Sequence, residues 1–343
     1  MIPIVYEEFG RRGKPILVLA GDIGGTKTNL ALFHYAESTF RLLQEKTYSS
    51  RSFNSFNDMV LDFVGSEKPD CISVGVAGPV INDSVKITNL NWSIEAKSCS
   101  ETTGIPHVYM INDLVANIYG LATLEAKDFV VFHEGAPDIM GNAAIISPGT
   151  GLGEAGMFWD GHYFHPFATE GGHADYAPET EEDIGLLLYL QKIHGHVSWE
   201  RVVSGMGINQ IFEFLCQYRD YQPDDQMREA LEKGDAAAII SQGSKDGDPV
   251  CKETMQMFWR NLANEAANIV MKYNGFGGVF IGGGIVPKNL DVLSKEDFLH
   301  YFLEAGRMKS LLEKVPVRIV LNDRAALQGA SFYGAIRFRL EHS

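Results

Sequence analysis

Short apolar runs alternate with glycine-rich turns in the first third of the chain. The run ILVLA at residues 16–20 is partly β-branched and ends at the turn GDIGGTKT, and two segments of alternating polarity follow at residues 28–35 and 40–48. This pattern predicts a strand, a glycine turn and two further paired strands. The elements expected next are a helix over residues 53–63, a strand over 71–79, a strand over 107–112 and a helix over 113–124.

The opening pattern returns near residue 142. There the strand-like NAAIIS is followed by the glycine turn PGTGLG and by two more strand-like segments, EAGMFWD and GHYFHPF. Strands that alternate with helices indicate an α/β architecture with a mainly parallel sheet, and the repeat predicts two similar lobes whose glycine turns face one cleft. After the second turn the chain is mainly helical, at residues 181–193, 204–218 and 250–273, with strands expected near 277–283 and 316–321 and a last helix over 325–340.

Length and charge narrow the possible functions. The 343 residues favour two domains, and 29 Lys and Arg against 44 Asp and Glu give a formal net charge of −15. Without a basic stripe, nucleic acid is not an expected partner. The apolar stretches are too short to span a bilayer and no signal peptide is recognisable, so no membrane role is expected. Four scattered cysteines without CxxC spacing favour the reducing cytoplasm.

The two glycine turns are candidate phosphate-binding loops. Neither fits the helix-opening motifs, because Thr26 separates Gly25 from Lys27 and a strand, not a helix, follows each turn. A hairpin can still hold phosphate through exposed backbone N–H groups, although a tight hairpin with no ligand is an equally good interpretation of either turn alone. Two such hairpins in duplicated positions could grip a nucleotide from both sides, and Asp22 could hold Mg²⁺ through water.

Two other places carry polar side chains where function is expected. Asp113 follows a strand and opens a helix, so it could act in catalysis, but its position alone favours a helix N-cap, and both roles can coexist. The run ATEGGHADYAP places Glu170 and His173 around two glycines, which allows backbone and side chains to approach a polar ligand. Isolated residues of these types are usually structural or solvated. No zinc-ligand set accompanies them.

Taken together, seven motifs resemble the bacterial-type glucokinases. In order they are GDIGGTKTNLAL, GVAGPV, INDL, SPGTGLG, EGGHADYAP, ERVVSGMGI and IGGGIVP, and they cover most of the chain from Leu17 onward. The resemblance implies the hexokinase and actin-like (ribonuclease H-like) α/β fold, ATP and Mg²⁺ as cofactors, and phosphorylation of glucose at its 6-hydroxyl as the first step of glycolysis. It also implies a cytoplasmic enzyme, expected to be a homodimer. The zinc-containing ROK (repressor, open-reading-frame and kinase) family carries a cysteine-rich site after this sugar motif, whereas the segment ETEEDIGLLLYLQ here has no cysteine, which favours the zinc-free branch.

The resemblance also assigns the site. It implies Asp113 as the catalytic residue, Asn112, Gly151, Glu170, His173 and Glu200 as the sugar contacts, and Asp22 as the magnesium ligand. The nucleotide-binding residues that it implies are Asp22, Gly24, Gly25, Thr26, Lys27, Gly149, Thr150, Gly283 and Gly284. The expected lobes are a small one over residues 1–124, onto which helix 325–343 packs back, and a larger one over 125–324 with added helices.

Some features depart from the family pattern. About thirteen residues precede the usual start, and Lys27 and Thr28 stand where Asn and Ala are frequent. Polyphosphate or ADP as phosphoryl donor and another hexose as acceptor therefore stay open. The alternatives outside this activity are a sugar- or ATP-binding regulator on the same fold and a dinucleotide-dependent oxidoreductase.

Overall fold

The computed structural model describes residues 2–36, 39–87, 90, 92–136 and 139–343, which form two compact units. The first unit comprises residues 1–128, 160–168 and 322–343, and the second comprises 129–159 and 169–321. Each unit is built around its own sheet. The expected boundary between a small lobe and a large lobe after residue 124 stays a prediction.

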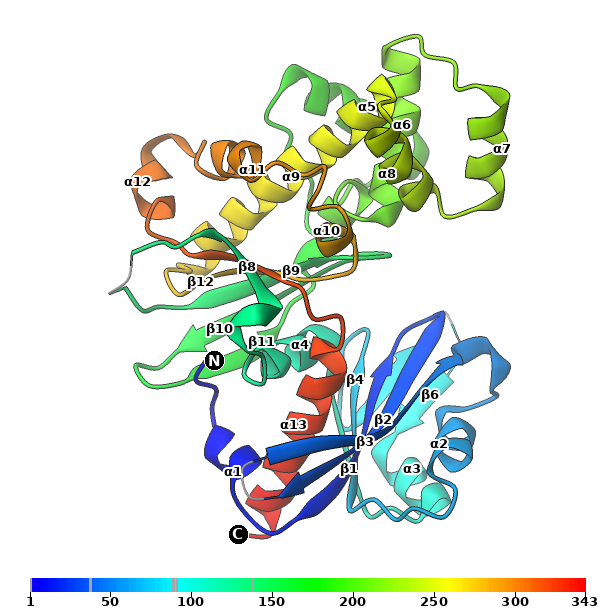
Figure 1. The fold of residues 1–343 in the computed structure, drawn as a ribbon, viewed down its shortest axis with the longest axis vertical. Helices are drawn as coiled ribbons and strands as arrows, with labels where there is room; N and C mark the ends of the chain where they lie inside the picture. Colours follow the sequence, from blue (N-terminus) through cyan, green and yellow to red (C-terminus); the bar gives the residue numbers. More distant parts are fainter. Residues whose placement is uncertain (1, 37–38, 88–89, 91, 137–138) are drawn as a thin grey trace. The chain divides into compact units, whose positions relative to one another are not determined.

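The sheet of the first unit has the strand order β3-β2-β1-β4-β7. Strand β1 pairs antiparallel with β2 and parallel with β4, which pairs parallel with β7, so the predicted combination of a glycine hairpin and parallel strands is confirmed. Figure 1 shows this sheet in blue and cyan. Its strands are β1 (Ile16–Ile23), β2 (Lys27–Ala36), β3 (Thr39–Ser49), β4 (Cys71–Val76) and β7 (His107–Asn112).

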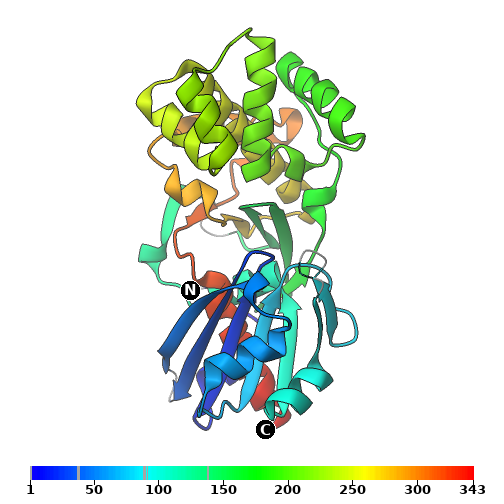
Figure 2. The ribbon, with the colours of Figure 1, turned by 90° about the vertical axis from the view of Figure 1, so that its right-hand side faces the viewer.

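Helices cover both faces of this sheet (Figure 2). On one face, α2 (Phe56–Val64) and α3 (Ala96–Thr103) help to bury Leu19 of β1. On the other face, α13 (Ala325–Glu341) approaches so closely that a Cβ on Gly334 would stand 2.6 Å from the Cβ of Ser73. This last helix therefore packs on the first unit. The remaining elements are the hairpin β5 (Ser84–Ile87) and β6 (Trp92–Glu95), α4 (Asp113–Leu121) and β11 (Phe164–Ala168).

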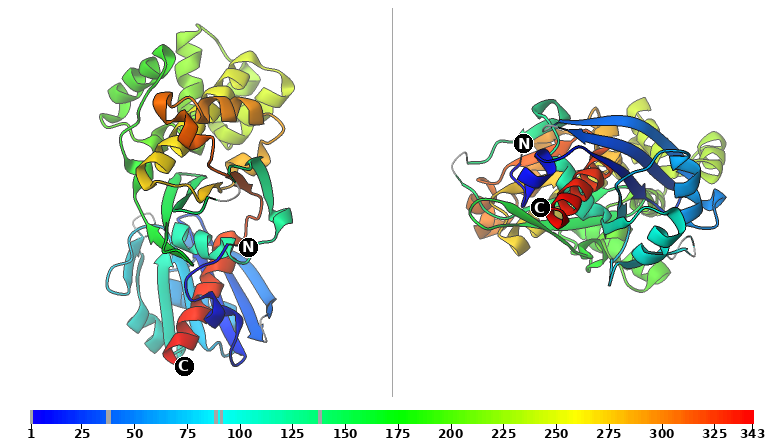
Figure 3. Two further views of the ribbon diagram at one scale, coloured as in Figure 1. Left: turned by 90° about the vertical axis from the view of Figure 1, so that its left-hand side faces the viewer. Right: turned by 90° about the horizontal axis from the view of Figure 1, so that it is seen from below.

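The segment before β1 is an integral part of the first unit. Its helix α1 (Glu7–Arg11) lies against α13, as Figure 3 shows. The Arg339 guanidinium of α13 donates hydrogen bonds to the carbonyl oxygens of Phe9, Gly10 and Lys14 at 2.9–3.0 Å. Ile4 is completely buried and bridges to Phe164. Hydrogen bonds and apolar packing thus fix both ends of this segment.

In the second unit, strands β10, β9, β12, β13 and β8 follow one another in this order. Strand β9 pairs antiparallel with β10 and parallel with β12, which repeats the arrangement of β1 with β2 and β4 and agrees with the predicted internal duplication. The bounds are β8 (Phe129–His133), β9 (Ala143–Pro148), β10 (Leu152–Trp159), β12 (Gly278–Ile281) and β13 (Val317–Val320).

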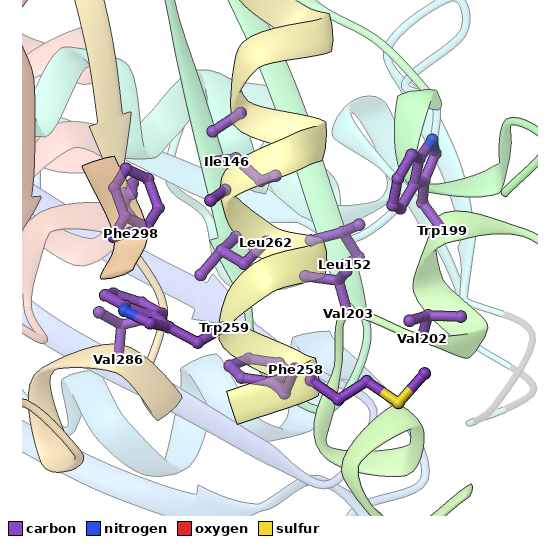
Figure 4. Packing of buried hydrophobic residues seen from close by; sticks show 14 of the residues in the cluster. Ile146, Leu152, Trp199, Val202, Val203, Phe258, Trp259, Leu262, Val286 and Phe298 are labelled. Atoms are coloured by element: carbon purple, nitrogen blue, oxygen red, sulfur yellow. The ribbon is translucent and has the colours of Figure 1, made fainter. Parts of the chain in front are cut away.

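The core of the second unit forms around α9 (Pro249–Tyr273). Figure 4 shows Phe258 and Leu262 of this helix among the side chains of Ile146 and Leu152 from the sheet. Full burial of a side chain such as Leu262 stabilises a fold by roughly 1.5–3 kcal/mol. The other helices are α5 (Glu181–His194), α6 (Gly205–Tyr218), α7 (Asp225–Lys233), α8 (Ala236–Asp246), α10 (Ile285–Lys288), α11 (Lys295–Phe302) and α12 (Lys309–Leu312).

Candidate active site

The first glycine turn is a tight hairpin between β1 and β2. The Gly24 N–H donates to the Lys27 carbonyl oxygen at 2.9 Å, and a Cβ on Gly24 would stand 2.9 Å from that oxygen. Completely buried Ser50 supports the turn from below, because its N–H bonds to the Thr26 carbonyl and its Oγ bonds to the Gly24 carbonyl. The turn is therefore held in one shape while Thr26 and Lys27 stay exposed.

Asp22 and Asp113 lie close to the same glycine, at the carboxyl ends of β1 and β7, the two strands that flank β4 in the sheet. Asp22 on β1 is in register with Gly75 on β4, and a Cβ on Gly75 would stand 3.6 Å from the Cα of Asp113. The pKa of the Asp22 carboxyl is raised by burial, and a hydrogen bond with Asn29 partly opposes this shift. A bound cation would favour the ionised carboxylate, which is the form that Mg²⁺ prefers.

The interpretation of Asp113 as the N-cap of α4 is wrong. Asn112 caps this helix, since its Oδ1 accepts hydrogen bonds from the N–H groups of Leu114 and Val115 at 2.9 and 3.3 Å. Asp113 is the first residue of the helix, and its Oδ1 lies 3.0 Å from the Leu114 N–H. The dipole of the helix favours an ionised carboxylate there. The cap of α4 therefore does not depend on the carboxylate of Asp113.

The second glycine turn, in the second unit, is bonded to the start of α6 and lies against a third glycine turn. The Gly149 N–H donates to the Gly151 carbonyl at 2.8 Å, and the Gly205 N–H at the start of α6 donates to the Gly149 carbonyl at 2.8 Å. Gly283 has a φ of +76°, and a Cβ there would stand 2.2 Å from the Pro148 carbonyl oxygen. The second turn, the start of α6 and the turn over residues 282–284 therefore form one cluster.

The residues implied as sugar contacts in the second unit also gather. His173 Nδ1 lies 4.0 Å from Glu200 Oε1, and His173 Nε2 lies 4.0 Å from Glu170 Oε2. Both distances are too long for hydrogen bonds, so a polar ligand could bond to all three groups. The side chains of Glu170 and His173 are 60% and 62% exposed, whereas that of Glu200 is only 23% exposed.

Glu200 connects this cluster to the second glycine turn. Its Oε2 accepts the Leu152 N–H at 3.0 Å, and a Cβ on Gly151 would stand 2.3 Å from the same oxygen. One carboxylate therefore orients the end of the turn and faces the imidazole of His173. Of the site residues predicted from sequence, Asp22, 24–27, Asn112 and Asp113 lie together in the first unit, and 149–151, Glu170, His173, Glu200, Gly283 and Gly284 lie in the second.

Two supporting residues were missed from the sequence. Ser50 lies 26 positions after Gly24. The sequence around it, SSRSF at residues 49–53, does not distinguish it from an ordinary loop serine. Gly205 belongs to the quoted motif ERVVSGMGI, and the signal that could have found it is the SG pair before a helical run, which is typical of a helix N-terminus. Ser204 does cap α6, with its Oγ accepting the Gly207 N–H at 3.0 Å.

Neither a metal cluster nor a membrane segment is found in the described part of the chain. Residues 2–36, 39–87, 90, 92–136 and 139–343 contain no group of three or more His, Cys, Asp or Glu side chains placed to hold a metal ion. Within these same ranges, every helix is too short or too polar to cross a bilayer. A Mg²⁺ ion that keeps most of its waters and binds one carboxylate and substrate phosphates needs no such cluster.

The fold is that of the sugar kinases of the actin-like class, and comparisons with known proteins specify the family. The model of the Glucokinase family matches residues 19–336. A glucokinase of Nostoc punctiforme is 36% identical over 339 residues, covering 93% of this chain and 99% of the relative. The crystal structure of a glucokinase from an Antarctic psychrotroph has a TM-score of 0.78 at 31% identity, covering 94% of this chain and 99% of that one.

A more distant structure shares the fold. It is a ROK family glucokinase from Streptomyces griseus in complex with glucose and AMPPNP, with a TM-score of 0.62 at 20% identity, covering 93% of this chain and 99% of that one. The chain belongs to the glucokinase family. The family and the actin-like α/β fold class predicted from the sequence are confirmed.

Proposed function

We propose that this glucokinase transfers the terminal phosphoryl group of ATP to glucose with Asp113 as the base. Asp113 accepts the proton of the sugar 6-hydroxyl, the hydroxyl oxygen bonds to the terminal phosphorus, and ADP leaves. Asn112, Gly151, Glu170, His173 and Glu200 bind the sugar. The two glycine turns bind the phosphates, and Gly283 and Gly284 lie against the adenosine.

The position of Glu200 is the observation that carries this proposal. Its carboxylate lies 4.0 Å from His173 and also accepts the N–H that ends the second glycine turn at 3.0 Å. A sugar hydroxyl held by Glu200 and His173 is thereby next to a phosphate-binding loop of the same unit. A carboxylate that contacts both the sugar site and a phosphate loop supports this proposal, because phosphoryl transfer needs a close and fixed approach of acceptor and donor.

Asp22 is the residue proposed to hold Mg²⁺, through water. Its half-buried carboxyl lies directly before the first turn, and the first turn exposes Thr26 and Lys27. When bound, Mg²⁺ neutralises charge on the phosphate oxygens. The Lys27 ammonium adds a second positive charge beside the Gly24–Gly25 backbone, which favours a polyanionic donor. We also propose a cytoplasmic location. The proposed homodimeric state can be tested by size-exclusion chromatography with light scattering.

The sugar assignment predicts a selective change in the Michaelis constants. Glu170→Gln and His173→Ala are each expected to raise KM for glucose at least about tenfold and to leave KM for ATP nearly unchanged, because a stranded polar partner costs about 1–3 kcal/mol. Initial rates of ADP release in a coupled assay give both constants. His300→Ala, which removes a 67% exposed imidazole on α11, is the matched control. Equal effects on both constants, together with a lower melting temperature, would mean that the two side chains are structural.

The turn at Gly283 is predicted to matter for the nucleotide. Gly283→Ala combines a φ of +76° with a contact of 2.2 Å to the Pro148 carbonyl, so the turn must move. We expect KM for ATP to rise about tenfold or more, with a smaller change in KM for glucose. Gly306→Ala controls for the backbone cost, since Gly306 has a φ of +53° and open space around its Cβ position. If both variants behave alike, the turn has no part in nucleotide binding.

Substrate range is tested with the same assay. Glucose, mannose and fructose are compared at fixed ATP, and ATP, ADP and polyphosphate are compared at fixed glucose. A glucokinase is expected to show its highest kcat/KM with glucose and ATP, by a margin that reflects the hydroxyls that each sugar lacks or misplaces. A chain that binds glucose and ATP without releasing ADP would be a regulator on this fold.

A further inference from the structure

Glu154 is a buried carboxylic acid directly beneath the proposed glucose-binding loop, and no role in the reaction has been assigned to it so far. It is the third residue of β10 and is only 3% exposed. A Cβ on Gly171 would stand 2.0 Å from Glu154 Oε2, and a Cβ on Gly172 would stand 2.1 Å from the Leu152 carbonyl oxygen. The turn over residues 171–173 therefore rests on β10 at these two glycines.

The main chain of Glu154 is attached to the same loop. Thr169 Oγ1 donates to the Glu154 carbonyl oxygen at 2.8 Å and also lies 3.2 Å from the Gly171 N–H. The loop from Thr169 to His173 thus meets both the backbone and the side chain of one residue. Glu170 and His173, which project from this loop, take their positions from that contact.

The charges around Glu154 determine the form of its carboxyl group. Of the residues that the structure describes, the titratable groups that face it lie on α9: Glu265 is completely buried, Lys272 is half exposed and Tyr273 is partly buried. The Lys272 ammonium bonds to Glu265 Oε1 at 3.0 Å, and Asn268 donates to Glu265 Oε2 at 3.0 Å. Lys272 is therefore the cation near both buried carboxyl groups, and it is bonded to Glu265 and not to Glu154. Among the described residues, Glu154 Oε1 has no hydrogen-bond partner.

A buried carboxylate beside another carboxylate and without its own cation is strongly disfavoured. Burial, and then the charge of Glu265, raises the pKa of Glu154 to about 8. The neutral acid fits against the backbone of Gly171 without repelling Glu265. The ionised form would either repel Glu265 or draw water into the space below the loop, and either response displaces the loop.

We propose that Glu154 is a positioning residue for glucose binding, which supports Gly171 in its neutral form and so holds Glu170 and His173 in the sugar-binding geometry. The inference rests on the proposed function, because it takes these two residues as the sugar contacts. If only the neutral form positions the loop, the apparent Kd for glucose is the intrinsic Kd divided by the neutral fraction. The result is an affinity for glucose that falls in alkaline solution.

The test is glucose binding to the full chain by isothermal titration calorimetry without nucleotide, from about pH 6.5 to 9. For the wild type we expect Kd to rise about tenfold between about pH 7 and pH 9, as follows from the pKa of about 8. Glu154→Gln, which has the same shape and no titration, should bind glucose within about twofold of the wild type at neutral pH and show no alkaline rise. Glu232→Gln, an exposed substitution on α7, should keep the rise of the wild type.

A melting curve gives a second readout that does not depend on glucose. The pKa of Glu154 is raised in the folded state from 4.5 to about 8, so its neutral form stabilises the fold fully below about pH 4.5, and this stabilisation is lost as pH rises toward 8. Glu154→Gln should flatten that part of the stability profile. Steady-state kinetics should place the pH effect in KM for glucose and leave KM for ATP unchanged.

The outcomes separate this inference from the proposed function. A wild-type Kd that is constant from pH 7 to 9, or an identical rise in Glu154→Gln, overturns the role of Glu154. If Glu170→Gln and His173→Ala change KM for glucose and the Glu154 variants behave like the wild type, the proposed sugar site stands and only this inference fails. If Glu170→Gln and His173→Ala change nothing, the sugar site itself is wrong.

Discussion

Replacing Asp113 by asparagine is expected to lower kcat by about 10² or more and to leave glucose binding nearly intact. The amide keeps the size and most of the hydrogen bonding of the acid but cannot accept the hydroxyl proton. The helix should survive the change, because Asn112 supplies the cap of α4 through bonds to Leu114 and Val115. The loss therefore belongs to chemistry and not to folding.

Single-turnover rates with ATP and glucose, set beside glucose binding by calorimetry, measure this effect. Asp58→Asn is the matched control, since Asp58 is an exposed acid in the first turn of α2, whose N-cap is Ser55. It should leave kcat unchanged. Turnover of Asp113→Asn within a few-fold of the wild type would show that the carboxylate at position 113 does not act as the base.

The second large effect is expected on stability, from Arg260→Ala. Asp183 is completely buried at the start of α5, and Arg260 of α9 donates to its Oδ1 at 2.8 Å. Burial alone would raise the pKa of Asp183, but bonds from Arg260, Thr180 and Asn261 lower it below the usual range. Removing the arginine leaves a buried charge with less compensation, which typically costs about 3–5 kcal/mol. Urea or thermal unfolding measures the loss.

A double substitution shows where that loss comes from. Arg260→Met with Asp183→Leu removes both charges and should unfold less readily than Arg260→Ala alone, because no completely buried carboxylate is left uncompensated. Glu182, which also loses Arg260, keeps its ion pair with Arg219. The lowered pKa of Asp183 also fixes the pH dependence: its stabilisation is present above the unfolded pKa of 3.8 and is lost as pH falls through the folded value. A single variant as stable as the wild type would mean that solvent reaches Asp183.

The sequence predicts the elements of this fold better than it predicts their contacts. Both glycine hairpins, the strand before Asp113 and the long helix α9 were predicted, because local turn chemistry and apolar periodicity decide them. Short elements such as β5, β6 and α12 were not, because their patterns are too brief to separate a strand or helix from a loop.

The same limit applies to the site. The motifs name the proposed site residues, but the contact between Glu200 and Leu152 joins positions 48 residues apart and depends on tertiary packing. Asn112, and not Asp113, caps α4 because the helix begins at Asp113. Apolar periodicity does not locate the start of a helix to within one residue. Glu154 looked like a polar residue in a strand, and only its burial beneath Gly171 distinguishes it.

The segment ahead of β1 has a practical consequence for expression design. The family model starts at residue 19, so a clone trimmed to that start would omit Phe9, Gly10 and Lys14, whose carbonyls accept the three hydrogen bonds of Arg339. It would also uncover Phe332, against which Gly10 packs. Affinity tags and cleavage sites should be added before this segment and should not replace it. The stretch that lies outside the shared family pattern therefore belongs in any expressed version of the chain, because it supplies contacts of the first unit.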